Sequence, residues 1–137
     1  MANTLYNIAR EKFLTGNMDW SSDTFKVALV HVATGAYTFS ATHTSLGNIG
    51  ANTINGSGGA QTLISKTFAD GAAGAANATF TSVPVGSTIE AIVIYRDEGA
   101  TTTLVAYIDT ATGLPITPNG GDIIVTWDTG VNKIFRL

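Results

Sequence analysis

The chain has 137 residues, no cysteine, a formal net charge of −3 and only 12% charged residues. Soluble domains usually contain about 25% charged residues, so much of this surface is expected to face other protein chains. The seven lysines and arginines are scattered, which argues against nucleic acid as a partner, because that binding depends on clustered basic groups. The absence of cysteine excludes thiolate metal sites, redox motifs and cysteine nucleophiles.

The length predicts a single domain over residues 1–137 that buries a core without a metal or a disulfide. The first residues lack the positive segment of a signal peptide. The longest apolar runs have the length of strands, far below the ~20 residues that span a bilayer, so we expect no membrane partner. A stable β protein coated with threonine and serine is the simpler alternative for this composition.

The N-terminal segment predicts one short helix over about residues 4–15. Asn3 or Thr4 stands where it would cap this helix, and Gly16 would end it. Two interpretations remain open: the helix docks on its own sheet, or it is an arm that packs on a neighbouring subunit. Its apolar stripe contains Leu5, Ile8, Ala9 and Phe13.

A polar turn with one large aromatic residue, Trp20, leads into a predicted strand over residues 24–32. Both faces of this strand are apolar, as expected in the middle of a sandwich or at a subunit contact. Residues 33–59 then predict a long loop, rich in small and polar residues, that carries the isolated aromatics Tyr37 and Phe39. Loops of this length are usually functional or disordered, so we expect a binding loop or an inter-subunit contact here.

The remainder of the chain reads as strands separated by turn signals. About seven strands with one helix, and without β-α-β alternation, predict a mainly β fold, an antiparallel β-sandwich or jelly-roll. Residues 72–77 are ambiguous between a helical turn and a loop. The predicted later strands are residues 61–68, 78–83, 89–96, 103–109, 122–127 and 133–137, with 89–96 and 103–109 forming a hairpin.

Alternation within residues 122–127 predicts that Ile123, Val125 and Trp127 pack on a core. It also predicts that Ile124, on the opposite face, lies against something drier than water.

No catalytic, metal or cofactor site is predicted. His31 and His43 lack the spacing of a zinc site, and no Gly-x-Ser-x-Gly elbow is present. The acidic pairs Asp19/Asp23 and Asp97/Glu98 fit turn and cap positions better than calcium or glycosidase sites. We therefore expect a protein that is not an enzyme.

Both ends of the chain resemble small virion proteins of tailed bacteriophages. The N-terminal part of the resemblance is carried by residues 5–16 (LYNIAREKFLTG), Trp20 and residues 25–30 (FKVALV). The C-terminal part is carried by residues 89–95 (IEAIVIY), 106–109 (AYID), 113–127 (GLPITPNGGDIIVTW) and 132–137 (NKIFRL).

The resemblance implies a capsid decoration, or cement, protein that binds the outside of the head and bridges major capsid protein subunits as a dimer or trimer. The implied location is the capsid surface of the virion, after synthesis in the cytoplasm of the bacterial host. The alternatives are a tail, baseplate or fibre accessory protein and a carbohydrate-binding β-sandwich module. The predicted subunit or capsid contacts are Leu5, Tyr6, Ile8, Phe13, Trp20, Tyr37 and Phe39.

Overall fold

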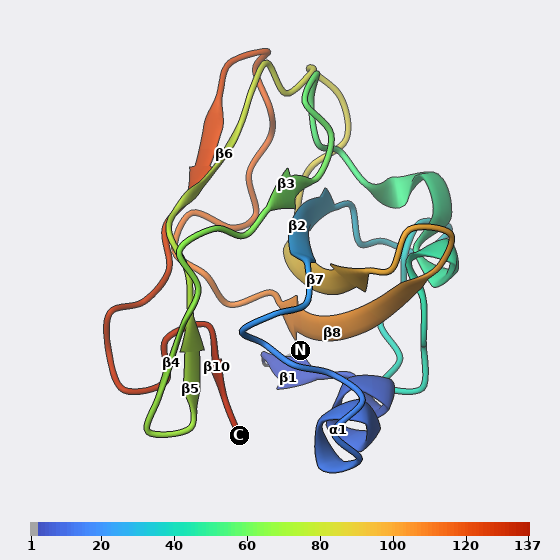
Figure 1. The fold of residues 1–137 in the computed structure, drawn as a ribbon. Helices are drawn as coiled ribbons and strands as arrows, with labels where there is room; N and C mark the ends of the chain where they lie inside the picture. Colours follow the sequence, from blue (N-terminus) through green and yellow to red (C-terminus); the bar gives the residue numbers. More distant parts are fainter. Residues whose placement is uncertain (1–2) are drawn as a thin grey trace.

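The computed structural model describes residues 3–137 as a mainly β protein with antiparallel sheets and one α-helix (Figure 1). This confirms the prediction of a mainly β, antiparallel fold with one helix. The first half contains β1 (Thr4–Leu5), α1 (Asn7–Leu14), β2 (Phe25–Val30), the 3₁₀ helices η1 (Leu46–Asn48) and η2 (Gly50–Asn52), and β3 (Gln61–Thr62). The second half contains β4 (Thr67–Ala69), β5 (Ala72–Gly74), β6 (Ala78–Phe80), β7 (Ala91–Asp97), β8 (Thr102–Ile108), β9 (Ile123–Val125) and β10 (Phe135–Arg136).

The largest sheet has the strand order β1-β8-β7-β2-β3, with every neighbouring pair antiparallel. The predicted hairpin is β7–β8, and the predicted strand over residues 24–32 contains β2. A bulge breaks the β7–β8 register, because Ile94 pairs with Ala106 while Tyr95 pairs with Leu104. Val105 is therefore the extra residue, and its carbonyl accepts a hydrogen bond from the Tyr6 N–H at 3.0 Å.

Both faces of this sheet are buried, which explains the apolar character of both faces of β2. One face packs with residues of β5, β6, β9 and β10 in a core that contains Phe25, Ile94 and Phe80. The opposite face, with Val30 and Tyr95, is covered by residues of the long loop. Figure 1 shows the short strands on one side of the sheet, the loop on the other, and α1 beside β1 and β8.

The short strands form two further antiparallel sheets, β10-β5-β4 and β6-β9. The prediction of one strand over residues 61–68 is wrong, because Ser65 adopts a positive φ of 52° and separates β3 from β4. The ambiguous segment 72–77 begins with strand β5. A tight turn connects β4 to β5 with positive φ at Asp70 (51°) and Gly71 (77°), the geometry that an Asp-Gly hairpin turn requires.

The predicted helix over residues 4–15 is correct in existence but wrong at its start. Thr4 and Leu5 pair with Tyr107 and Ala106 as an edge strand, and α1 begins at Asn7 after Tyr6 in the N-cap position. Neither Asn3 nor Thr4 caps it. Cross-strand pairing with β8 therefore overrides local helix propensity at these residues. The helix ends before Gly16, which has a φ of 72°.

Residues 33–59 contain no named strand, as predicted, but two 3₁₀ helices and isolated bridges order them. The loop packs on the sheet through Tyr37 and Ile49, which are both buried. Backbone bonds anchor the far end of the loop: Ile54 N–H to the Leu29 carbonyl at 2.8 Å and Ser57 N–H to the Thr81 carbonyl at 3.0 Å. The loop is therefore a cover for the main sheet.

Candidate binding grooves

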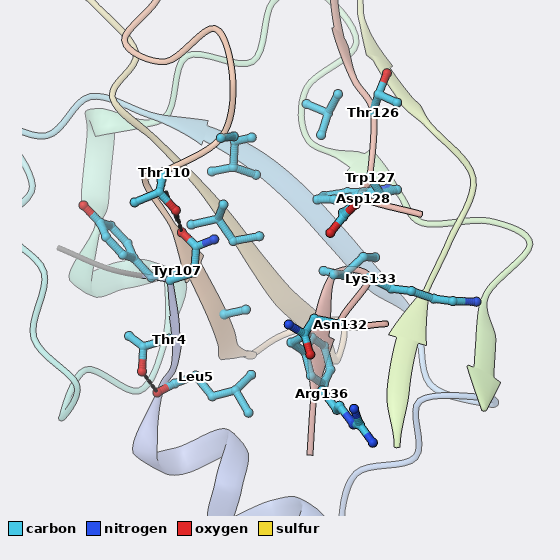
Figure 2. Close-up of a pocket in the computed structure, with 18 of the residues that line it drawn as sticks. Thr4, Leu5, Tyr107, Thr110, Thr126, Trp127, Asp128, Asn132, Lys133 and Arg136 are labelled. Carbon is cyan, nitrogen blue, oxygen red and sulfur yellow. Dashed lines mark hydrogen bonds between the residues drawn. The ribbon is translucent and has the colours of Figure 1, made fainter. Parts of the chain in front are cut away.

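A groove of about 940 Å³ lies between the β1–β8 edge of the main sheet and the C-terminal segment (Figure 2). We call it the interlayer groove. Its base includes Leu5, Ile92 and Ile108 of the main sheet. Its remaining walls include Thr4, Arg10, Thr110, Ile124, Thr126, Trp127, Asp128, Asn132, Lys133 and Arg136.

Hydrogen bonds hold two walls of the interlayer groove in place. The Asn3 side-chain oxygen accepts from the backbone N–H groups of Asp109 (3.1 Å) and Thr110 (3.2 Å) and from the Thr110 hydroxyl (2.8 Å). On the opposite wall, the Trp127 indole N–H donates to the Ala76 carbonyl at 3.0 Å. A volume of about 940 Å³ lies at the upper end of the ~300–1,000 Å³ range of small-molecule pockets, so the groove also has room for a short extended peptide or an oligosaccharide.

Three basic residues lie in the lining of the interlayer groove. Arg10, Lys133 and Arg136 line the groove, and none forms an ion pair within residues 3–137. Figure 2 shows Lys133 and Arg136 extending outward from the wall rather than across the groove. Asp128 is the acidic residue of the lining, so the rim carries excess positive charge although the chain is acidic as a whole.

A second, apolar groove of about 280 Å³ lies between α1, the turn at Trp20 and the β10-β5-β4 sheet. The Trp20 ring packs edge-on against Phe135 with centroids 5.3 Å apart, and Phe13 lies 6.0 Å from Phe135. Beside them, Phe68 and Leu137 remain 66% and 65% exposed. Large apolar side chains this exposed at a groove are typical of a contact with another protein.

The seven predicted contact residues have different positions. Phe13 and Trp20 line the apolar groove, and Leu5 lies at the base of the interlayer groove. A partner contact through Tyr6 or Tyr37 would require these side chains to leave their own packing, since they are 0% and 2% exposed, whereas Ile8 and Phe39 are half-buried. All four, Tyr6, Ile8, Tyr37 and Phe39, pack with the core between the main sheet and the loop.

Tyr6 and Tyr37 belong to a hydrogen-bonded chain beneath the loop. Their hydroxyls are 2.9 Å apart, and the Tyr37 hydroxyl lies 2.9 Å from Nδ1 of His43. Burial raises the pKa of both tyrosines, and it raises the pKa of Tyr107 to about 12. The phenols therefore remain protonated at neutral pH and hold the loop on the sheet.

A charged network connects α1 to β7 and β8. The Arg96 guanidinium, in a residue only 8% exposed, contacts the carboxylates of Asp23 at 3.0 Å and Glu98 at 2.9 Å. Lys12 lies 3.6 Å from Glu98, and the Thr103 hydroxyl also donates to Glu98. These donors, with Thr103 first, lower the pKa of Glu98 to about 2. Every cation here already has a partner, so we interpret the network as structural.

His31 also has a structural environment. Its Nδ1 lies 2.7 Å from the Thr88 carbonyl and 3.1 Å from the Glu90 carboxylate. Both of these are acceptors, so Nδ1 carries the proton. The same carboxylate accepts from the Val32 N–H at 2.7 Å, and the pair thereby connects the end of β2 to the residues preceding β7.

Within residues 3–137, no cluster of three or more histidine or acidic side chains is arranged to hold a metal ion. No helix in the same range is long and apolar enough to cross a membrane. No protein-family model, curated protein or solved structure matches the chain.

Sequence reasoning does not identify most residues of either groove. Local pattern places Phe68, Asp128, Asn132 and Arg136 only in strands and turns. The polar and basic residues around Trp127 were an available signal for the interlayer groove. A phenylalanine on a strand next to an Asp-Gly turn was an available signal for the apolar groove. The interlayer groove forms because β10 packs near β1, and the apolar groove forms because β4 and β10 pack near α1. Local sequence pattern does not predict this packing.

Proposed function

We propose that this chain is a non-enzymatic structural protein of a tailed-phage virion and serves as a capsid decoration protein. It binds the outside of the head, stabilises contacts between major capsid protein subunits and self-associates as a dimer or trimer. The observation that carries the proposal is the interlayer groove, whose size and mixed lining suit a segment of another protein chain. The resemblance of both chain ends to small virion proteins supports the choice of partner.

We also propose that the layers form a β-sandwich of the jelly-roll kind. The support is one core shared between a face of the main sheet and the two smaller antiparallel sheets. Such a domain is rigid, and its rigidity suits a protein that bridges fixed positions on a shell.

The capsid contact lies at the interlayer groove. An extended segment of the major capsid protein that carries apolar and acidic side chains complements its apolar base and its positive rim. Ile124, which is 62% exposed on the wall, is then covered by the partner. Many equivalent copies on one shell multiply a modest contact by avidity.

A matched pair of variants tests this proposal. Ile124→Asp places a charge on the groove wall, whereas Val85→Asp places the same charge at a similarly exposed apolar position (74% against 62%) outside the groove lining. In co-sedimentation with heads that lack the protein, we expect Ile124→Asp to reduce binding at least tenfold and Val85→Asp to leave it unchanged. Equal binding by both variants, with both folded, would contradict the assignment of the groove.

Absence of head binding by the unaltered protein would contradict the decoration role itself. Localisation to the tail or baseplate by negative-stain electron microscopy would then favour the accessory-protein alternative.

Trp127 favours one further candidate, a carbohydrate-binding module. Its ring is held at the groove wall beside Asp128 and Asn132, and an aromatic face with planar polar side chains is a common sugar environment. Titration calorimetry with host surface polysaccharide separates the two functions. Saturable heat that Trp127→Ala abolishes supports glycan binding. If no heat is observed, the carbohydrate-binding function is rejected and the capsid segment remains the proposed occupant of the interlayer groove.

A further inference from the structure

The outer edge of β4 carries unpaired backbone groups. In the β10-β5-β4 sheet, the Ala73 carbonyl accepts from Ile134 N–H at 2.9 Å and the Gly71 carbonyl accepts from Leu137 N–H at 2.8 Å. The backbone N–H and C=O groups of Gly71 and Ala73 therefore point toward β10. Because these directions alternate along a strand, the backbone groups of Ala72 and Gly74 point toward β4. Their partners Ala69 and Thr67 use their backbone groups toward β5, which leaves the N–H and C=O of Phe68 directed outward.

The side chains of β4 are unusually exposed to solvent for a strand that carries a phenylalanine. All three residues of β4 are exposed, and the Phe68 side chain overhangs the apolar groove formed by Phe13, Trp20 and Phe135. Within residues 3–137, no strand lies beyond β4 in its sheet. An exposed edge with a large apolar side chain is a template for pairing with another strand.

The sequence around Phe68 is complementary to itself. If two copies pair antiparallel about a twofold axis through Phe68, each Phe68 faces its counterpart and exchanges two backbone hydrogen bonds with it. In the same register Lys66 of one copy lies opposite Asp70 of the other, on both sides of the axis. Opposite charges directly across an antiparallel pair stabilise it, and like charges destabilise it.

We propose that the β4 edge is the self-association surface of this protein, and that it pairs with β4 of a second copy in the register Phe68 opposite Phe68. The Lys66 ammonium already donates to the Asp23 carbonyl. An ammonium group has three N–H donors, so Lys66 can also donate to the Asp70 carboxylate of the second copy. The pairing joins two three-stranded sheets into one of six strands and covers Phe68. This inference rests on the self-association proposed above, but not on capsid binding.

Sedimentation equilibrium of the purified full chain tests the pairing. We expect a concentration-dependent dimer whose dissociation constant rises at least tenfold in Asp70→Lys, which sets two lysines opposite each other, and in Lys66→Asp, which sets two aspartates opposite each other. An equimolar mixture of the two variants restores opposite charges at both positions, so a heterodimer of near-original affinity is expected. Glu11→Lys makes the same change of charge on an exposed helix position outside the apolar groove and should leave the dimer intact.

A fourth variant provides a control for misfolding, which is needed because Lys66 also packs over Trp20 and Phe25. Phe68→Pro removes the outward N–H and keeps the bonds of Thr67 and Ala69 to β5; it should be monomeric with its thermal unfolding still cooperative. A dimer or trimer that survives Phe68→Pro and both charge reversals would overturn the β4 assignment alone. A wild-type protein that stays monomeric at high concentration would overturn self-association altogether, while head binding remains a separate measurement.

Discussion

Glu98 shows how single residues decide the stability of this fold. Its carboxylate receives bonds from Thr103 and Arg96 and lies near Lys12, so one side chain connects α1, β7 and β8. Arg96 is almost fully buried, and removal of a carboxylate partner leaves its charge poorly compensated.

At this scale we predict that Glu98→Gln lowers the free energy of unfolding at pH 7 by about 1–2 kcal/mol. The folded-state pKa of about 2 lies below the usual value of 4.5. The contribution is therefore complete above about pH 4.5 and is lost as the pH falls toward 2. Urea unfolding of both proteins from pH 7 to pH 2 measures it. A difference between the proteins that stays constant across this range would contradict the mechanism.

The long loop shows how an element without strands is still specified. Its end is fixed against β6, where Gly56 has a φ of 78° and a Cβ added there would collide with the Thr81 carbonyl. Gly50 has a similar φ of 65°, but a Cβ added there meets no atom. Comparison of the two glycines therefore separates the cost of a left-handed backbone from the cost of a steric clash with a neighbouring carbonyl.

At the scale of elements we predict that Gly50→Ala costs about 1 kcal/mol of stability, from the left-handed backbone alone. Gly56→Ala should cost at least twice as much, because the Thr81 carbonyl has to move as well. Thermal unfolding of the two variants checks this, and equal losses would contradict the close approach at Gly56.

One of the two apolar cores of the molecule is shared by all three sheets. Both ends of the chain join it, since Leu5 packs there from β1 and Ile134 packs beside β10. Trp20 lies in this core, and Trp127 packs against it from the opposite wall of the interlayer groove. The two smaller sheets therefore have no interior of their own, because their core is the one that they share with a face of the main sheet.

At this scale we predict two-state unfolding. Far-ultraviolet circular dichroism should show the same urea midpoint as the fluorescence of Trp20→Phe and of Trp127→Phe, each of which reports the remaining tryptophan. Midpoints that differ between the two probes within one variant would indicate that one sheet unfolds separately.

Much of the main sheet follows from local pattern in the sequence. The apolar runs around β2, β7 and β8 have strand length and contain β-branched residues, so their existence, and the β7–β8 hairpin, were predictable. The long loop and the absence of β-α-β alternation also follow from composition. These features depend on residues close together in the chain, where turn chemistry and side-chain alternation act directly.

Features that depend on distant partners became visible only in the folded chain. Thr4 and Leu5 form a strand by pairing with the edge of β8, and the carbonyl of the bulged Val105 accepts a hydrogen bond from the Tyr6 N–H. The two grooves likewise exist because β4, β9 and β10 pack near N-terminal residues such as Leu5, Phe13 and Trp20, which lie more than 40 residues away in the sequence. Local sequence pattern thus determined most of the strands, and composition determined a surface with few charges. Long-range pairing determined which apolar residues are buried in the core and which remain exposed to a partner.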